Sequence, residues 1–419
     1  MRQCSAVDEQ VLEKQIAELP ELPEQMQDVV KHILMYGKVD SKNGMRYTKR
    51  YILECLLLSI KSRKGYLHLR SHNILPLPTP STLRKYLKNM KAQYGFDLSV
   101  FKMLKLKSEN MKPEERRGVL VLDEMSLSKG VHFDCEKLSV MGFTDLGDYT
   151  PEHQKSQRGD HALVLMFQPF RGSWVQNIAA FLSKGAANGE VLNHIVLEAI
   201  ILLDNSGFQV DVVTTDGGQW NRRIWTLFGL KKYTADCIHP CSKPTDEDSN
   251  QRRLHFCSDF SQLVKNFRNF VMDDETVETP DGTVKKEHYR AIIRCDGGAK
   301  HLGLKIAHKL TSDHLDPQFY QKMHVHKAFD VFSANVATAM DIYRNMDKAL
   351  KDCDPTIELL RRFGTLITTM TSRCPFNGLK IDSEDYHNII SCREYLQNWK
   401  DFAKRTTIVL CPKVHIRVL

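Results

Sequence analysis

Apolar and polar residues follow two different periods along this chain. Around residues 48–62, 81–90 and 188–205 the apolar residues recur at helical spacing. Around 119–122, 139–143, 162–167 and 174–181 they form short runs instead. Helical spacing predicts amphipathic helices, and short apolar runs bounded by polar residues predict buried strands. The two patterns occupy different parts of the chain, so we expect helical regions on either side of a central α/β region.

The central region predicts a sheet with intervening helices. The four short runs predict a meander of strands, and a helix over 188–205 follows, with Val191, Ile195, Leu197 and Ile201 inward. Another buried strand ends at Asp216, and a further strand, "RLHFCSD", leads into the helix "FSQLVKNFRNFV". Three antiparallel strands, a helix, a strand, a helix and a strand are the order of an α/β ribonuclease-H-like domain, which we expect over residues 118–274.

The region before it predicts short helices. Residues 1–40 predict an amino-terminal helical extension, "DEQVLEKQIAEL". In 41–117, Ile52, Cys55, Leu56 and Ile60 share a helical face. Ser81, after Pro80, predicts the N-cap of a further helix.

The helix that follows Ser81 is basic. Leu83, Tyr86 and Leu87 line one face of it, and its cations line the other, namely Arg84, Lys85 and Lys88. Short helices ending in a basic one resemble a helix-turn-helix, whose last helix binds DNA in the major groove. A solvated surface face without DNA fits the same pattern.

Helices dominate the remainder of the chain. A polar hairpin or loop is expected at "DDETVETPDGTVKKEH", and amphipathic segments then predict a helical domain over 275–405. One of these segments places Met323, Ala328, Phe332, Val336 and Met340 on a single buried face. Residues 406–419 resemble a strand fragment without a partner.

Composition adds few constraints. With 419 residues the chain is long enough for two or three domains, and its net charge of +8 is compatible with a polyanionic partner. The eleven cysteines follow no secretory signal, so we expect reduced thiols in the cytosol or nucleus. No apolar run approaches the roughly 20 residues that span a bilayer, so no membrane partner is expected.

Cys237, His239, Cys241 and Cys257 suggest zinc, although their spacing matches no familiar finger.

Acidic residues mark the ends of two predicted strands. Asp123 and Glu124 follow the run "VLVL", and Asp216 follows "VDVVTT". Paired carboxylates repel and need a cation or a shared proton, and Mg²⁺ or Mn²⁺ accepts such oxygen ligands. Ordinary turn aspartates would produce the same pattern. Glu124 points away from the strand end and is expected to be structural.

Five ordered blocks resemble P-element-type transposases, the family that includes THAP-domain transposases. They are "KGYLHLRSHNILPLPTPSTLRKYL", "LVLDEMS", "DVVTTDGGQWNRRIW", "FCSDFSQLVKNFRNF" and "KMHVHKAFDVFSANVATAM". The resemblance implies metal-dependent DNA cleavage and strand transfer, with Asp123 and Asp216 as catalytic metal ligands. It also implies transposon-end DNA as partner, action in the nucleus and a GTP-binding insertion, and it leaves a homo-oligomer open.

The chain departs from the family pattern in several places. The family's third acid, a Glu in "RL-(x)-QD-(x)-(x)-E", has no counterpart here, and no THAP zinc module precedes residue 40. The resemblance therefore implies a carboxy-terminally incomplete member with impaired catalysis, or an inactive DNA-binding or interaction protein. Whether the chain is an enzyme stays open. Asp259 matches an acid in "SD-(x)-(x)-HL-(x)-K" and is expected to cap a helix.

The nucleotide contacts implied by the resemblance are also altered. Lys309 and Val325 match family contacts, whereas His324 stands where a lysine is expected. Thr368 and Thr371 replace the Asp and Asn that read guanine in the family, and a single hydroxyl cannot present two acceptor oxygens to the guanine edge as a carboxylate does. Weakened GTP binding follows from these changes.

Overall fold

The computed structural model describes residues 23–38, 45–88, 94–134, 139–186, 188–216, 219–230, 234–242, 251–297, 305–372 and 378–405. The helix expected at 8–19 and the strand fragment expected at 406–419 lie outside these residues, as does the side chain of Lys88. The chain divides into two compact units, Met1–Ala92 and Gln93–Leu419. No helix among the described residues has the length and apolar character needed to cross a membrane.

The first unit is a small helical domain. Its helices are α2 (Glu24–Lys38), α3 (Lys49–Lys61), α4 (Arg63–Ser71) and α5 (Pro80–Lys88). They enclose a core in which Tyr51, Ile52, Cys55 and Tyr66 are almost fully buried. The expected face of α3 is confirmed at three positions but wrong at Ile60, which is 73% exposed in the last turn before the helix ends at Lys61.

The expected cap of α5 is also wrong. The helix already includes Pro80 and Ser81, and the Tyr66 hydroxyl holds the preceding segment by donating to the Pro78 carbonyl at 2.8 Å. The Thr79 hydroxyl oxygen accepts the backbone N–H of Thr82 at 3.1 Å. Proline fits the first helical position because its missing N–H would have no partner there. The N-cap of α5 is therefore Thr79, two residues before the predicted Ser81.

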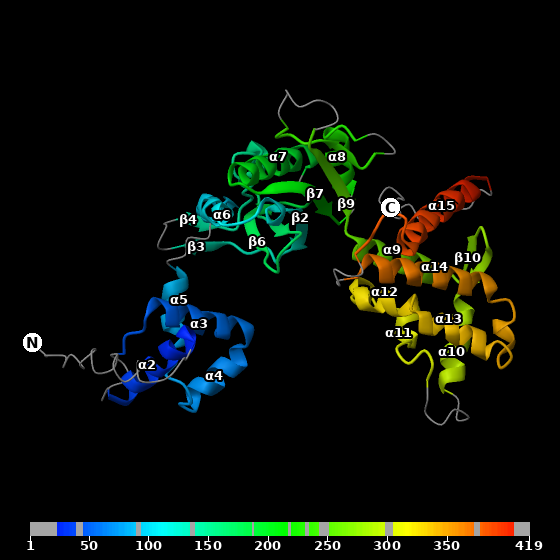
Figure 1. Cartoon of the computed structure of the whole chain (residues 1–419), viewed down its shortest axis with the longest axis horizontal. Coiled ribbons are helices and arrows are strands. Elements are labelled where there is room, and N and C mark those ends of the chain that lie inside the picture. Colours follow the sequence, from blue (N-terminus) through cyan, green and yellow to red (C-terminus); the bar gives the residue numbers. More distant parts are fainter. Residues whose placement is uncertain are drawn as a thin grey trace, which may run out of the picture. The chain divides into compact units, whose positions relative to one another are not determined.

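The second unit contains a seven-stranded mixed sheet in the order β1-β6-β5-β2-β7-β9-β8. Figure 1 labels β6, β2, β7 and β9 of this sheet. The strands are β1 (Gly95–Phe96), β2 (Arg117–Ser126), β5 (His161–Pro169), β6 (Gln176–Ser183), β7 (Gln209–Thr215), β8 (Asp236–Ile238) and β9 (Arg253–Ser258). The β2, β5 and β6 strands form an antiparallel meander, and β7 and β9 add in parallel. This arrangement confirms the ribonuclease-H-like α/β fold.

One predicted strand belongs elsewhere. Residues 139–143 were expected in the meander, but β4 (Ser139–Met141) pairs only with β3 (His132–Asp134) in a separate two-stranded sheet. Gly142 adopts a φ of +108°, a conformation that glycine tolerates and that ends the strand. The apolar run therefore forms a side hairpin.

Three helices pack against the sheet, namely α6 (Leu98–Glu109), α7 (Gly189–Asn205) and α8 (Gln219–Leu227). The α7 helix fulfils the expectation for 188–205, with Asn188 as its N-cap. Its buried face contains Leu192, Ile195 and Ala199, whereas Ile201 is 41% exposed. The prediction is therefore confirmed at Ile195 and wrong at Ile201, because apolar residues lie on more than one side of this helix.

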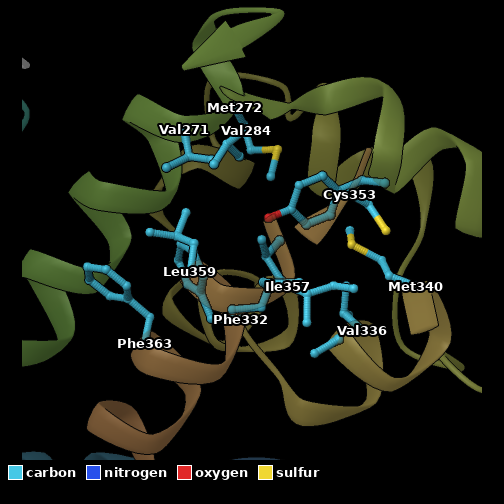
Figure 2. Close-up of a cluster of buried hydrophobic side chains, with 14 of the residues drawn as sticks. Val271, Met272, Val284, Phe332, Val336, Met340, Cys353, Ile357, Leu359 and Phe363 are labelled. Atoms are coloured by element: carbon cyan, nitrogen blue, oxygen red, sulfur yellow. The ribbon is translucent and has the colours of Figure 1, made fainter. Parts of the chain in front are cut away.

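The remaining elements form a helical region with one hairpin. They are α9 (Phe260–Asp273), β10 (Thr276–Thr279), β11 (Gly282–Lys285), α10 (Lys286–Gly297), α11 (Ser312–Leu315), α12 (Val325–Val331), α13 (Ala334–Tyr343), α14 (Asp354–Met370) and α15 (Glu384–Arg405). Their side chains share one core, in which Phe332, Val336, Met340 and Leu359 converge (Figure 2). Met323 was expected on that buried face but is 62% exposed, because it precedes α12 in a short 3₁₀ turn.

Candidate functional site

The β2 strand positions Asp123 at its carboxyl half. Leu120 and Leu122 point into the core, with exposures of 0% and 2%. Alternate residues of a strand face opposite sides, so Asp123 projects from the other face. It lies opposite Val164 of β5 and its side chain is exposed. The apolar run therefore anchors the strand, and the acid that follows it reaches solvent.

The β7 strand brings Asp216 level with Asp123. The two strands run parallel, and Val121 lies opposite Thr214. Asp216 follows directly after β7, two residues beyond Thr214, as Asp123 is two residues beyond Val121. The carboxyl ends of neighbouring parallel strands lie at the same edge of a sheet. The two aspartates are therefore next to each other at that edge. This confirms the neighbouring placement expected from the sequence.

A third acid, Asp259, follows the next strand. Its backbone N–H donates to the Thr215 carbonyl at 2.8 Å, which ties the end of β9 to that of β7. Its side chain accepts the backbone N–H of Ser261 at 2.8 Å and caps α9. The expected capping role is therefore confirmed, and the cap lies beside Asp216.

These acids influence one another electrostatically. Although Asp123 is exposed as a residue, partial burial of its carboxyl raises the pKa above its usual range, and the charges of Asp216 and Asp259 raise it further. The charge of Lys265 acts in the opposite direction on the same pKa. Unfavourable negative charge thus gathers at this edge, as expected of carboxylates placed to receive a cation.

Lys265 is a member of the site that sequence reasoning missed. It lies on α9, is 6% exposed, and its Nζ approaches Met323 Sδ at 3.8 Å. Burial lowers its pKa, whereas the charges of Asp216 and Asp259 raise it. The signal was present in the sequence, because Lys265 is the final lysine of the block that contains Asp259. The structure thus adds a buried ammonium group to the acids.

The residues at this edge suit a hard divalent cation. Mg²⁺ takes oxygen ligands and is commonly held by one or two carboxylates together with water and phosphate. Asp123 and Asp216 supply such oxygens from adjacent strands. Across the described ranges, no group of three or more His, Cys, Asp or Glu side chains has the arrangement of a metal site. Cys237, His239, Cys241 and Cys257 are among these residues and do not form such a group; His239 Nδ1 instead accepts the Cys241 N–H at 3.1 Å.

A second candidate site is a pocket of about 550 Å³ in the helical region. Its lining comprises Lys309, Phe329, Asp330, Phe332, Ser333, Ala334, Ala337, Thr338, Leu360, Arg361, Gly364, Thr365, Ile367, Thr368, Thr369 and Asp385. Apolar surface and a few polar groups in a concave site are typical of small-molecule binding.

Of the three predicted nucleotide contacts, one lines this pocket and two do not. Lys309 lines the pocket, 3.6 Å from the carboxylate of Asp330. His324 and Val325 are not among the lining residues; they form the N-cap and first residue of α12. Thr368 lines the pocket, whereas the Thr371 hydroxyl donates to the Ile367 carbonyl of its own helix.

The predicted DNA-binding face of α5 is partly described. The side chains of Arg84 and Lys85 are exposed, and Leu83 on the opposite side is 3% exposed. Tyr86, expected beside Leu83, is 41% exposed. The helix therefore presents at least two cations to solvent.

Two family models match the second unit. Residues 92–229 match the TNP-like RNase H N-terminal domain, and residues 261–381 match the TNP-like GTP-binding insertion domain. The first stretch contains Asp123 and Asp216, and the second contains Lys265 and Lys309.

Known proteins resemble most of this chain. Human DNA transposase THAP9 (Homo sapiens) is 23% identical over 327 residues, which are 77% of this chain and 35% of that protein. The transposable element P transposase of Drosophila melanogaster is 20% identical over 362 residues, 86% of this chain and 44% of that protein. The chain thus spans less than half the length of either relative.

A solved structure shares the fold. The Drosophila P element transposase strand transfer complex superposes with a TM-score of 0.68 at 19% identity, covering 98% of this chain and 83% of that one. Both domain models, both relatives and this fold lead to one conclusion: the chain belongs to the family of P-element-type transposases.

Proposed function

We propose that this chain cleaves DNA and transfers DNA strands, with Asp123 and Asp216 holding divalent cations. The observation that supports the proposal most directly is the pairing of β2 with β7, which brings the two aspartates level at one sheet edge. Bound Mg²⁺ or Mn²⁺ would activate an attacking oxygen and stabilise the leaving oxygen of a phosphodiester.

The side chains around the aspartates have separate roles in this proposal. Asp123 and Asp216 supply oxygen ligands, and Asp259 holds the start of α9 through its cap to Ser261. The Lys265 ammonium offsets part of the negative charge of these aspartates. It would reduce the repulsion between them when no cation is bound. DNA would be the partner, its phosphates contacted by Arg84, Lys85 and Lys88 if α5 belongs to a helix-turn-helix. The site of action would be the nucleus.

A nicking assay tests the proposal. Purified chain with Mg²⁺ or Mn²⁺ should convert supercoiled plasmid to nicked circles, and EDTA should stop the reaction. Asp123→Asn and Asp216→Asn should each lower the rate about 100-fold or more, because the cations lose a direct ligand. The parent rate also tests the impaired catalysis that the resemblance implied.

Asp259→Asn is the matched control. It removes a carboxylate from the same sheet edge while an asparagine still caps the helix, so cleavage should persist. A parent chain that binds DNA but never nicks it with either metal would contradict the proposal and leave a DNA-binding role. Equal rates for the parent and Asp216→Asn would contradict it as well.

We also propose that the insertion pocket binds a nucleoside triphosphate. Its volume, its apolar lining and Lys309 support this, together with the match to a GTP-binding insertion domain. The Lys309 ammonium is 63% exposed and is the kind of cation that contacts phosphate as a point charge.

A further inference from the structure

Asp385 is a carboxylate in the pocket that the family resemblance did not indicate. It lies in the first turn of α15, after the stretch that matches the insertion-domain model. It lines the same pocket as Lys309 and Thr368. The pocket therefore still offers an acid, although threonines occupy the positions where the resemblance implied guanine contacts.

A neighbouring threonine orients this carboxylate. The Thr369 hydroxyl, from the end of α14, donates to Asp385 Oδ1 at 3.0 Å. Each carboxylate oxygen accepts about two hydrogen bonds, so both oxygens keep accepting capacity toward a ligand. Thr369 lines the pocket too, so this hydrogen bond lies in its wall and fixes Asp385 there.

The other pocket acid is already engaged. Asp330 lies 3.6 Å from Lys309 Nζ and 3.8 Å from His314 Nε2, and its side chain is 20% exposed. Asp385 forms no ion pair within 4.0 Å with a cation of the described residues. The carboxylate available to a neutral ligand group is therefore that of Asp385.

The substituting threonines are bonded within their own helix. The Thr368 hydroxyl donates to the Gly364 carbonyl at 2.9 Å, and the Thr371 hydroxyl donates to the Ile367 carbonyl at 2.7 Å. The O–H donor of each threonine is therefore already used, and neither side chain is charged. They cannot replace a carboxylate, which leaves that role to α15.

We infer that Asp385 reads the base of the bound nucleotide and makes the pocket selective for guanine. Guanine presents two adjacent N–H donors on its Watson–Crick edge, which match the two oxygens of a carboxylate. Adenine presents a donor beside an acceptor, so one carboxylate oxygen would face a lone pair. This inference rests on the proposed nucleotide binding and adds the residue that selects the base.

Competition binding against a fluorescent GTP analogue tests the inference on the full chain. The parent should prefer GTP to ATP and to xanthosine triphosphate. Asp385→Asn should weaken GTP binding about 10- to 100-fold, because a hydrogen bond to a charged group is lost. It should also strengthen xanthosine triphosphate binding, since xanthine places a carbonyl where guanine has its amino group and an amide can donate to it.

Two further variants separate base reading from a general effect. Glu384→Gln removes the preceding carboxylate of the same helix, which does not line the pocket, and should leave all three affinities unchanged. Thr369→Val keeps the carboxylate but removes its hydrogen bond, so GTP binding should fall a few-fold without a gain for xanthosine triphosphate. Unchanged melting temperatures confirm that each variant is folded.

The outcomes distinguish the two proposals. If the folded parent binds no nucleoside triphosphate, the nucleotide-binding proposal is wrong. If the parent binds GTP and Asp385→Asn keeps the same preference among the three nucleotides, the pocket binds nucleotide but Asp385 does not read the base. A switch toward xanthosine triphosphate supports both.

Discussion

At the scale of single residues, the chain places several titratable groups where water cannot reach them. His288 is one of these, with an exposure of 0%. Its ring nitrogens contact the Thr356 hydroxyl at 2.7 Å and the Asp352 carboxylate at 3.3 Å. Burial lowers the pKa of His288, and Asp352 partly offsets that effect. The folded chain therefore favours the neutral ring.

This burial predicts a pH dependence of stability. A histidine whose pKa is lower in the folded than in the unfolded state stabilises the fold above its unfolded pKa of about 6.5, and that contribution is lost as the pH falls. The melting temperature should therefore fall between pH 7.5 and 5.5. His288→Gln should show a smaller fall than the parent, and exposed His387→Gln should follow the parent. Parallel curves for all three would show that His288 does not contribute.

The residues of the two candidate sites could be predicted only in part. Asp123 and Asp216 were identifiable because each follows an apolar strand, and the sheet order confirms that their strands are neighbours. Lys265 and Asp385 were missed because both lie on helices whose polar positions are expected to face solvent. Only the tertiary contacts of α9 and α15 show which of those positions are buried or line a pocket.

At the scale of elements, the sequence predicted most strands and helices but not always their faces. Periodicity identified α3 and α7, yet Ile60 and Ile201 are exposed. When a helix has apolar residues on several sides, the elements that pack against it determine which side is buried. These elements are distant in sequence, so the sequence of the helix alone does not identify that side. Residues 139–141, in contrast, pair with β3, a strand close to them in sequence, rather than with the main sheet.

The α9 helix shows how one element serves two regions. Its capping residue Asp259 lies beside the acids at the sheet edge, whereas Phe267 stacks on Phe363 of the helical core at a centroid distance of 4.1 Å. Lys265 lies between them in sequence. The position of this ammonium relative to the acids is thus fixed by packing in the helical core.

The α5 helix leads to a prediction about DNA. Arg84→Ala with Lys85→Ala should weaken binding to duplex DNA and reduce the slope of log affinity against log salt by about 2, one unit for each lost phosphate contact. Lys351→Ala, which removes an exposed cation beyond α5, is the control and should leave the slope unchanged. An unchanged slope in the α5 variant would exclude this helix from the DNA interface.

At the scale of the whole molecule, the chain combines a small helical unit with a larger one that contains both candidate sites. The order of apolar segments was sufficient to predict a ribonuclease-H-like sheet between helical regions. The two sites were less predictable, since each draws side chains from elements far apart in sequence, such as Asp123 with Asp259 and Lys309 with Asp385. Such convergence depends on strand order and helix packing.

Binding of Mn²⁺ followed by electron paramagnetic resonance is the most direct test of the central claim, that Asp123 and Asp216 form a cation site. Titrating the parent chain into Mn²⁺ should diminish the signal of the free ion. Asp123→Asn and Asp216→Asn should each restore most of that signal, whereas Asp259→Asn, which removes a nearby charge but no direct ligand, should keep most of the parent's binding. Equal Mn²⁺ binding by the parent and both site variants would contradict the account.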